Sequence, residues 1–381
     1  MVSLPKFISF WKMRASFAEV GGPINYTGLT PGTVTDPMKG GVINPISVYP
    51  FPNFKAEQTK SYELGTNLRL FNNKINIDAT VYLTDTYNQT FLSSMSPASG
   101  YSGFYVQAGK VRNKGIELSL GYNDQFGKVG YATNLTYTAN RNKIMKMVHD
   151  YKNPSDGSLF SITELTLQDK GGVYLREKDA IGDVYVKGIL ARGKDGKLIE
   201  EEGGYKVDRS QRIKIGSVNP DFSIGWRHNV TWNNITLDLL FNGRFGGIVT
   251  SSTQAFLDDY GVSKDTYKAR QNGGVWVNGT QYDAEKYYTT IGGEQLMAYY
   301  AYKATNIRLQ EASLSYTLPG KWFGNVINRL TVSAIGRNLW MIYNKAPFDP
   351  EMTSSTGTYN RGDVFMPPSL RSVGFSVKIE L

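Results

Sequence analysis

The segment from Asn234 to Phe245 alternates between apolar and polar side chains. Successive side chains of an extended strand point to opposite faces. One face would therefore carry Ile235, Leu237, Leu239, Phe241 and Phe245, and the other Thr236, Asp238, Asn242 and Arg244. This pattern suits the wall of a membrane β-barrel, with lipid on one side and polar groups on the other. A half-buried strand of a soluble sandwich alternates in the same way, so the rest of the chain has to decide.

Nine further segments have a similar strand-like pattern. They span residues 7–19, 58–70, 74–87, 111–121, 128–142, 222–232, 304–318, 329–343 and 371–381. In segment 304–318 the apolar residues change parity, because Ile307 is odd-numbered and Leu314 is even-numbered. A β-bulge near Gln310 and Glu311 would restore a single apolar face. We therefore expect about ten strands, an even number, as in outer-membrane barrels.

The connections between these segments are sorted by length. Short turns near residues 72, 125, 233 and 322 alternate with long connections at 20–55, 88–110, 143–217, 246–300 and 344–368. In an up-and-down antiparallel sheet alternate connections lie on opposite edges, so all the short ones would share one edge. Outer-membrane barrels have this asymmetry, with short periplasmic turns and long outer loops. The sequence therefore predicts an all-β fold, an antiparallel transmembrane β-barrel, here a partial barrel of about ten strands with long extracellular loops.

The composition agrees with this fold class and narrows the chemistry. The 381 residues include 40 Gly and 25 Tyr but no Cys, so disulfides, thiol nucleophiles and Cys-ligated metals are excluded. No apolar run is long enough for a transmembrane helix. The net charge of +9 comes from scattered Lys and Arg rather than a basic run, so we expect no nucleic-acid partner.

Several blocks resemble a known family. They are K-M-R-A-S-F-A-E-V-G-G (Lys12 to Gly22), K-S-Y-E-L-G-T-N-L-R-L-F-N-N-K-I (Lys60 to Ile75), V-R-N-K-G-I-E-L-S-L (Val111 to Leu120), N-I-R-L-Q-E-A-S-L-S-Y-T-L-P (Asn306 to Pro319), S-A-I-G-R-N-L-W (Ser333 to Trp340) and F-D-P-E (Phe348 to Glu351). In this order they are similar to the C-terminal barrel portion of SusC/RagA-type TonB-dependent outer-membrane transporters from Bacteroidetes.

The resemblance implies a function and partners. The implied function is active, TonB-energised import of oligosaccharides or peptides across the Gram-negative outer membrane. The implied partners are outer-membrane lipid, TonB (through an N-terminal region) and a SusD-like surface lipoprotein that caps the mouth as a lid. The implied activity is transport and not catalysis, so we expect no enzyme and no cofactor.

Departures from the family pattern shape the expected domain organisation. The resemblance implies an export signal, a carboxypeptidase-like domain, a TonB box, a plug and the first barrel strands ahead of this chain. We expect residues 1–381 to be the C-terminal part of one receptor barrel, without these segments. The family's Asp-rich loop is replaced by A-R-G-K-D-G-K (Ala191 to Lys197), where Asp195 is the remaining carboxylate, so a calcium site is not expected. The family commonly ends in Phe, and here the last residue is Leu381.

Candidate site residues come from the polar faces of the strands. Asp238, Asn242, Arg244 and Arg337 are expected to face the lumen, where each could contact substrate or a plug. His149 and His228 are far apart, and His228 shares its face with Trp226, so a packed or interfacial histidine is favoured over a catalytic one. The runs Asp258-Asp259 and Glu200-Glu201-Glu202 are expected to be solvated loop charges. No catalytic, cofactor or metal site is predicted.

Two other classes of protein fit parts of the pattern. One is a soluble or cell-surface β-rich binding module, such as an adhesin or a lectin-like protein. The other is a barrel enzyme that uses His228. A need for detergent to keep the protein soluble would favour the transporter over the first class, and hydrolase activity that depends on His228 would favour the second.

Overall fold

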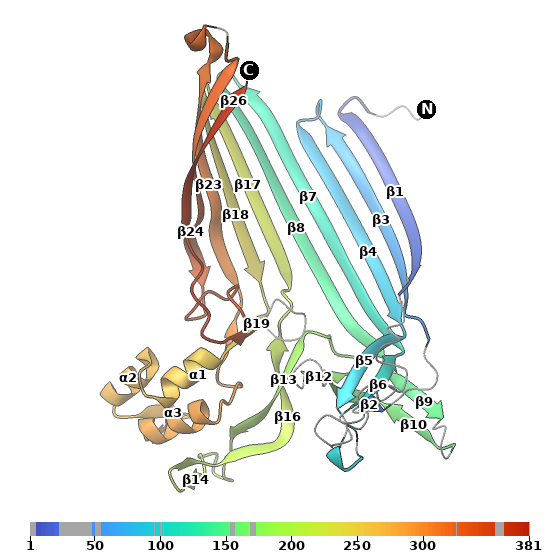
Figure 1. Cartoon of the computed structure of the whole chain (residues 1–381), viewed down its shortest axis with the longest axis vertical. Coiled ribbons are helices and arrows are strands. Elements are labelled where there is room, and N and C mark those ends of the chain that lie inside the picture. The colour runs from blue at the N-terminus through green and yellow to red at the C-terminus, as the bar shows by residue number, and fades with distance from the viewer. Residues whose placement is uncertain are drawn as a thin grey trace, which may run out of the picture.

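The computed structural model describes residues 5–22, 48–49, 55–94, 96–99, 101, 103–152, 157–167, 173–324, 326–354 and 362–380. A ten-stranded antiparallel sheet dominates these residues, in the order β1-β3-β4-β7-β8-β17-β18-β23-β24-β26. Its long strands run side by side as one curved wall (Figure 1). Their bounds are Ile8–Gly21 (β1), Gln58–Leu70 (β3), Ile75–Tyr87 (β4), Lys110–Phe126 (β7), Val129–Lys146 (β8), Phe222–Trp232 (β17), Ile235–Phe245 (β18), Asn306–Pro319 (β23), Arg329–Asn344 (β24) and Ser372–Glu380 (β26). The predicted fold class and all ten predicted strands are thus confirmed, while Leu381 lies outside the described residues.

The short connections lie together on one edge of the wall, as the connection lengths predicted. Figure 1 shows this short-turn edge at the top and the long connections at the bottom. The turn after β3 has positive φ at Phe71, Asn72 and Asn73, a backbone conformation that Asn tolerates better than most residues. The β7–β8 turn is tighter than predicted, because the strands remain paired as far as Phe126 and Val129.

The predicted bulge is present in β23. Leu240 pairs with Glu311 and the next residue, Phe241, pairs with Leu309, so Gln310 is the extra residue. The register shifts at the same point on the other side of β23, between Leu309 and Glu311. The bulge returns Ile307 to the face that carries Leu314, for the reason given by the parity of the sequence.

The two faces of the wall differ in chemistry. Leu64 on β3, Val81 on β4 and Ile116 on β7 are direct cross-strand neighbours, and all three are exposed apolar residues. Leu237 and Leu314 form the same kind of pair between β18 and β23. The opposite face is polar and carries ion pairs such as Arg14–Asp78, at 2.6 Å. An exposed apolar face this broad requires an apolar solvent, which lipid supplies.

Where the structure describes them, the long connections fold into substructures of their own, which the sequence analysis did not predict. Residues 89–94 and 103–108 join a five-stranded sheet, and the later connections hold further hairpins and three helices. The strands are Val48–Tyr49 (β2), Gln89–Ser94 (β5), Gly103–Ala108 (β6), Val148–Lys152 (β9), Leu159–Ile162 (β10), Glu164–Leu167 (β11), Val173–Arg176 (β12), Asp183–Leu190 (β13), Glu200–Glu201 (β14), Gly204–Tyr205 (β15), Val207–Ser217 (β16), Ile248–Ser251 (β19), Val275–Val277 (β20), Thr280–Tyr282 (β21), Ala301–Lys303 (β22) and Gly362–Asp363 (β25). The helices are Ser252–Asp259 (α1), Lys264–Gln271 (α2) and Ala284–Gly293 (α3), with short 3₁₀ turns at Pro97–Ser99 (η2) and Gly320–Phe323 (η3).

The buried apolar cores lie mainly in these connections. One core gathers residues from β5, β6, β11 and β12 around the fully buried Ile144 at the end of β8. A second joins Leu190 and Leu198 to helices α1 and α3 through Ala255 and Ile291. The sequence did not predict these cores, because their residues are far apart along the chain and become neighbours only when distant connections pack together.

Within the described residues, no helix is long and apolar enough to cross a membrane.

Candidate functional site

The polar face of the wall is the first candidate site, and strand register fixes which residues share it. Asp238, Asn242 and Arg244 alternate along β18 with the exposed apolar residues of the other face. Arg337 on β24 pairs with Glu311, the direct partner of Leu240. All four predicted site residues therefore lie on the polar face, and their contact with substrate or plug stays a prediction.

Asp238 is already held by the wall itself. Its carboxylate accepts bonds of 3.0 and 2.9 Å from Nε of Arg227 on β17. Asn229 Nδ2 donates to the same carboxylate at 3.3 Å. Because Asp238 is 7% exposed, it reaches a ligand less readily than Arg227, whose side chain is 57% exposed.

The other three predicted residues differ in their hydrogen bonds and in their exposure. Arg244 Nη2 donates to the backbone carbonyl of Val218 at 2.6 Å, which ties β18 to the connection before β17. Arg337 Nε donates to Glu311 Oε2 at 2.9 Å, but the Arg337 side chain is 65% exposed. Asn242 is exposed. Asn242 and Arg337 are therefore the two of the four whose side chains are exposed on the polar face.

A buried cation at the loop edge of this face was missed from the sequence. Arg308 on β23 is 5% exposed and makes a two-pronged ion pair with Asp349, through bonds of 3.2 and 2.8 Å. Asn306 Oδ1 accepts two more bonds from Arg308, and Glu351 lies 3.7 Å away. The signal was present, since N-I-R-L and F-D-P-E were both recognised as family blocks, but nothing in a sequence says that the two blocks touch.

Burial and pairing act in opposite directions on Asp349. Burial is the largest single influence and would raise the pKa of its carboxyl, but the hydrogen bonds from Arg308, Ser369 and the Glu351 backbone N–H together hold that pKa below its usual range. The carboxylate is therefore charged at neutral pH, and the pair fixes the connection after β24 to the wall.

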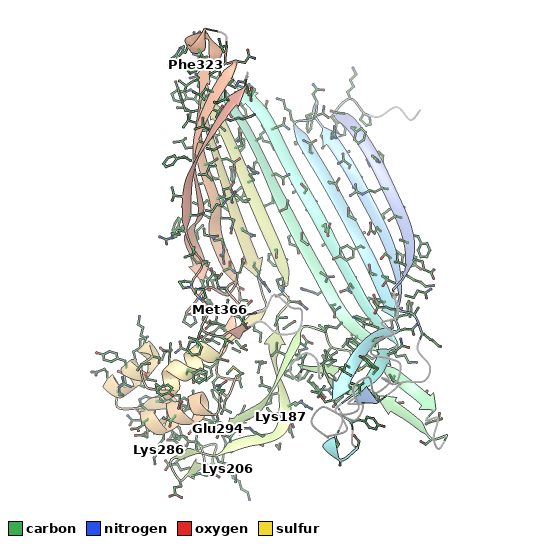
Figure 2. The ribbon with its side chains drawn as sticks, viewed as in Figure 1. Lys187, Lys206, Lys286, Glu294, Phe323 and Met366 are labelled. Carbon is green, nitrogen blue, oxygen red and sulfur yellow. The ribbon has the colours of Figure 1, made fainter. Side chains whose placement is uncertain are left out.

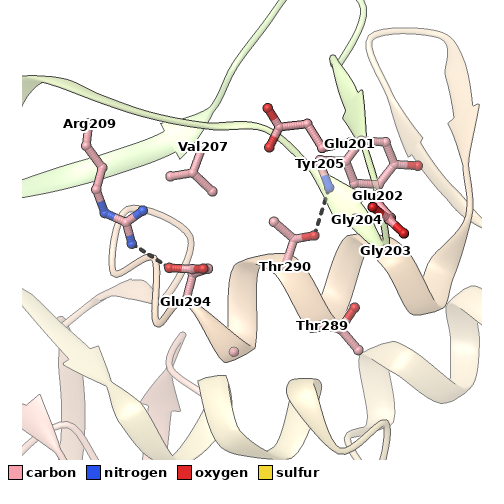
Figure 3. Close-up of a pocket in the computed structure, with 11 residues that line it drawn as sticks. Glu201, Glu202, Gly203, Gly204, Tyr205, Val207, Arg209, Thr289, Thr290 and Glu294 are labelled. Carbon is pink, nitrogen blue, oxygen red and sulfur yellow. Dashed lines mark hydrogen bonds and ion pairs between the residues drawn. The ribbon is translucent and has the colours of Figure 1, made fainter.

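A pocket lies far out on the loop edge, between the hairpin of β14 and β15 and helix α3. It has a volume of about 510 Å³ and a polar lining that includes Glu201, Glu202, Arg209 and Glu294. Figure 3 shows Arg209 and Glu294 facing each other at one end, where Nη2 lies 2.7 Å from Oε2. Figure 2 places Lys206, Lys286 and Glu294 in the same outlying region, with Phe323 at the opposite, short-turn edge.

The Thr290 hydroxyl joins the hairpin and the helix on the two sides of this pocket. The backbone N–H of Tyr205 donates to Thr290 Oγ1 at 3.1 Å (Figure 3), and that hydroxyl donates to the Lys286 carbonyl at 2.6 Å. The hairpin approaches the helix closely because residue 204 is a glycine, where a Cβ would lie 2.4 Å from the Thr290 hydroxyl. The pocket can bind small polar groups, and its paired charges carry no catalytic geometry of nucleophile and base.

The two clusters of carboxylates that were expected in solvated loops differ in their burial. Glu200 and Glu201 lie in strand β14, and both are exposed, as expected. Asp258 was expected to be solvated, and this was wrong: it lies in α1, is 4% exposed and accepts a bond of 3.0 Å from Gln254. Burial raises the pKa of the Asp258 carboxyl, although its hydrogen bonds oppose the shift.

The two histidines are separated in the structure as well. His149 Nε2 lies 2.6 Å from Glu177 in the loop region. His228 Nδ1 lies 2.9 Å from the Tyr131 hydroxyl, and its ring is 4.3 Å from that of Trp226 on the apolar face. His228 is therefore a packed histidine, one of the two alternatives that the parity of β17 favoured over a catalytic role.

Comparisons with known proteins agree with the architecture. The family described as TonB dependent receptor-like, beta-barrel matches residues 3–242, more than half of the chain. Among curated relatives, TonB-dependent receptor P3 of Formosa agariphila is 25% identical over 373 residues, which cover 90% of this chain and 36% of the relative. TonB-dependent receptor P39 of the same organism is 21% identical over 415 residues, covering 95% of this chain and 38% of the relative.

Solved structures share the fold. The RagAB peptide importer in its closed-closed state superposes with a TM-score of 0.73 at 19% identity, over 99% of this chain and 41% of that chain. The structure of the RagAB peptide transporter gives a TM-score of 0.71 at 17% identity, again over 99% and 41%. The present chain therefore spans well under half the length of the proteins it matches.

These findings agree with the SusC/RagA-type resemblance of the sequence blocks, and the relatives are named as receptors rather than enzymes. The exposed apolar face of the ten-stranded wall, the sorted connections and the match over more than half of the chain lead to one conclusion. This chain belongs to the TonB-dependent receptor β-barrel family of the bacterial outer membrane.

Proposed function

We propose that the chain forms the C-terminal ten strands of one TonB-energised barrel that imports oligosaccharides or peptides. The observation that carries the proposal is the two-sided wall with its sorted connections: the long connections that the structure describes lie on the same edge. Outer-membrane barrels carry longer loops at the extracellular mouth and short turns at the periplasmic one, and the long connections would supply a surface that contacts large solutes. The RagAB peptide importer shares this fold, and this similarity supports import as the function.

The domain organisation follows from the coverage of relatives. The matched portion amounts to 36% and 38% of the curated receptors, so the remaining strands and the plug would come from other parts of the receptor polypeptide. In this arrangement TonB acts through that other region. A SusD-like lipoprotein would seat on the folded connections at the loop edge, which would then face outside the cell.

The polar face of the wall would line the lumen. Asn242 and Arg337 would meet passing substrate or the plug, whereas Asp238 and Arg244 would act mainly within the wall. The folded pocket beside α3 would lie outside the membrane with the other connections.

Uptake by intact cells tests the proposal. Cells that carry the full-length receptor are given a fluorescent oligopeptide or a fluorescent oligosaccharide, and accumulation is compared with that of otherwise identical cells lacking TonB. We expect accumulation of one of the two solutes, its loss without TonB, and a large reduction when the SusD-like partner is deleted. Accumulation of neither solute, or accumulation unaffected by TonB, would refute active import.

Lumen contact is tested in the same cells. Asn242→Ala removes an exposed amide without breaking a bond of the wall. We expect a higher solute concentration at half-maximal uptake, with unchanged receptor abundance. Lys194→Ala, an exposed change in a distant hairpin, is the matched control. Equal uptake by the two variants would exclude Asn242 from the substrate path.

A further inference from the structure

Three cations gather on the apolar face of the wall, at the loop end of the β7–β8 hairpin. Lys114 on β7 is the direct cross-strand partner of Arg141 on β8. Lys143 is two residues beyond Arg141 and therefore lies on the same face, diagonal to Lys114. All three side chains are exposed.

Strand parity places this cluster on the lipid-facing side. Lys114 shares its face with Ile116, which is 38% exposed and pairs with Val81 of the apolar row. Arg141 and Lys143 share theirs with Ala139, the partner of Ile116. The opposite face at this level carries Asn140 and Asn142 instead. The cations are therefore not lumen residues.

The position along the strand puts the cluster at a membrane boundary. The next charged side chain on this face of β7 is Asp124, ten residues away towards the short-turn edge, where it pairs with Lys74 at 2.7 Å. Ten residues at about 3.3 Å each, tilted by about 45°, cover about 23 Å of membrane thickness. The apolar band of an outer-membrane barrel is about 25 Å tall, so Lys114 and Asp124 mark its two limits.

The cluster has fewer anions than cations. Lys114 and Lys143 have no ion-pair partner within the part of the chain that the structure describes. Arg141 forms an ion pair of 3.1 Å with the exposed Asp221. Neighbouring Arg112 and Lys110 both form ion pairs with Asp85. Together with the three cations of the cluster, this makes five cations and two carboxylates, Asp85 and Asp221. Like charges directly opposite each other across two strands are unfavourable. Asp221 balances Arg141 only, so an external anion would stabilise Lys114 and Lys143 beside it.

From this geometry we infer that Lys114, Arg141 and Lys143 bind the phosphate groups of a lipid headgroup in the adjacent leaflet. The apolar residues next to the cluster accept the acyl chains, and the cations meet the phosphates where the apolar band ends. A soluble anion or an acidic protein would use the cations without the apolar band beside them. The leaflet is the outer one if the long connections face outside, so that part of the inference rests on the proposed function.

The experiment uses the full-length receptor in detergent and two probes, diphosphorylated lipid A and the same lipid after removal of both phosphates. Binding is titrated by native mass spectrometry for the wild type, for Lys114→Gln with Lys143→Gln, and for a control with Lys194→Gln and Lys197→Gln. The control removes the same charge from an exposed hairpin away from the membrane. Unchanged heat-modifiable migration shows that each variant remains folded.

We expect the wild type and the control to bind the phosphorylated lipid equally. The Lys114 and Lys143 double variant should bind it on the order of thirtyfold more weakly, since each cation near a lipid surface contributes about one kcal/mol. Equal affinity of the wild type for the two probes, or equal loss in the two double variants, would overturn the inference and reduce the lysines to general interfacial anchors. Import is scored separately: a receptor that discriminates the two lipids but imports nothing refutes transport alone, and an active importer that does not discriminate them refutes the lipid site alone.

Discussion

Arg308 on β23 holds Asp349, which lies 41 residues later, through two parallel N–H···O bonds of 3.2 and 2.8 Å. The side chains are 6% and 8% exposed, so this pair is shielded from water. It joins the barrel wall to the connection after β24, and thereby links two sequence blocks that characterise the family resemblance.

Breaking this pair should destabilise the protein strongly. Asp349→Asn would leave the buried Arg308 with the Asn306 amide oxygen and, 3.7 Å away, the carboxylate of Glu351. Loss of one partner of a buried ion pair costs about 3 kcal/mol or more. The measurement is the free energy of unfolding of the full-length receptor in detergent with urea. Arg337→Gln is the control, because its exposed pair with Glu311 should contribute less than about 1 kcal/mol. Similar costs for the two substitutions would show that burial of Arg308 is unimportant.

The assignment of the two faces is tested on adjacent residues of β18. Leu239→Lys would place a charge on the lipid side, at a cost of about 2–4 kcal/mol near the middle of the bilayer, and should reduce the amount of assembled barrel. Asp238→Ala removes a carboxylate from the polar side and leaves Arg227 exposed to water, so assembly should remain near the wild-type level. Heat-modifiable migration of outer-membrane extracts measures both. Equal tolerance at the two positions would contradict the orientation of β18.

The hairpin at the loop-edge pocket should depend on a single hydroxyl. Thr290→Val keeps the shape but removes the acceptor for the Tyr205 N–H, and an unsatisfied buried donor costs about 1–3 kcal/mol. We expect faster amide hydrogen exchange in β14 and β15. Thr289→Val is a matched control one residue away, because the Thr289 hydroxyl donates only to carbonyls of its own helix. Unchanged exchange in Thr290→Val would mean that the hairpin is held by other contacts.

Asp258 should make helix α1 sensitive to pH. Burial raises the pKa of its carboxyl above the ordinary 3.8, so the folded state favours the protonated form. The stabilisation is fully present below pH 3.8 and is lost as the pH rises through the higher pKa of the folded state. Hydrogen exchange in α1 and α3, corrected for the intrinsic effect of pH, should therefore report greater protection at the acidic end. Asp258→Asn should flatten this dependence; if the dependence persists in that variant, another group is responsible.

The strands of the wall could be predicted in detail because each carries its own information. Period-two alternation in 235–245 marks both the strand and its lipid side, and the parity change between Ile307 and Leu314 located the bulge at Gln310. The connections could not be predicted in this way. Leu190, Ala255 and Ile291 share one core, yet no local period connects them, so the sequence predicts neither α1 and α3 nor the hairpins around them.

Sequence by itself therefore determined the fold class, the ten strands and the two faces, because each strand shows its own alternation between lipid-facing and polar residues. The family came from the resemblance of the sequence blocks. Only the tertiary structure decided which polar residues are free. Strand register and loop packing showed that Asp238 is used by Arg227 and Asp349 by Arg308, whereas Asn242, Lys114 and Lys143 keep polar groups available. The physical reason is that an ion pair depends on the distance between side chains from different strands, and that distance is fixed only when the strands align.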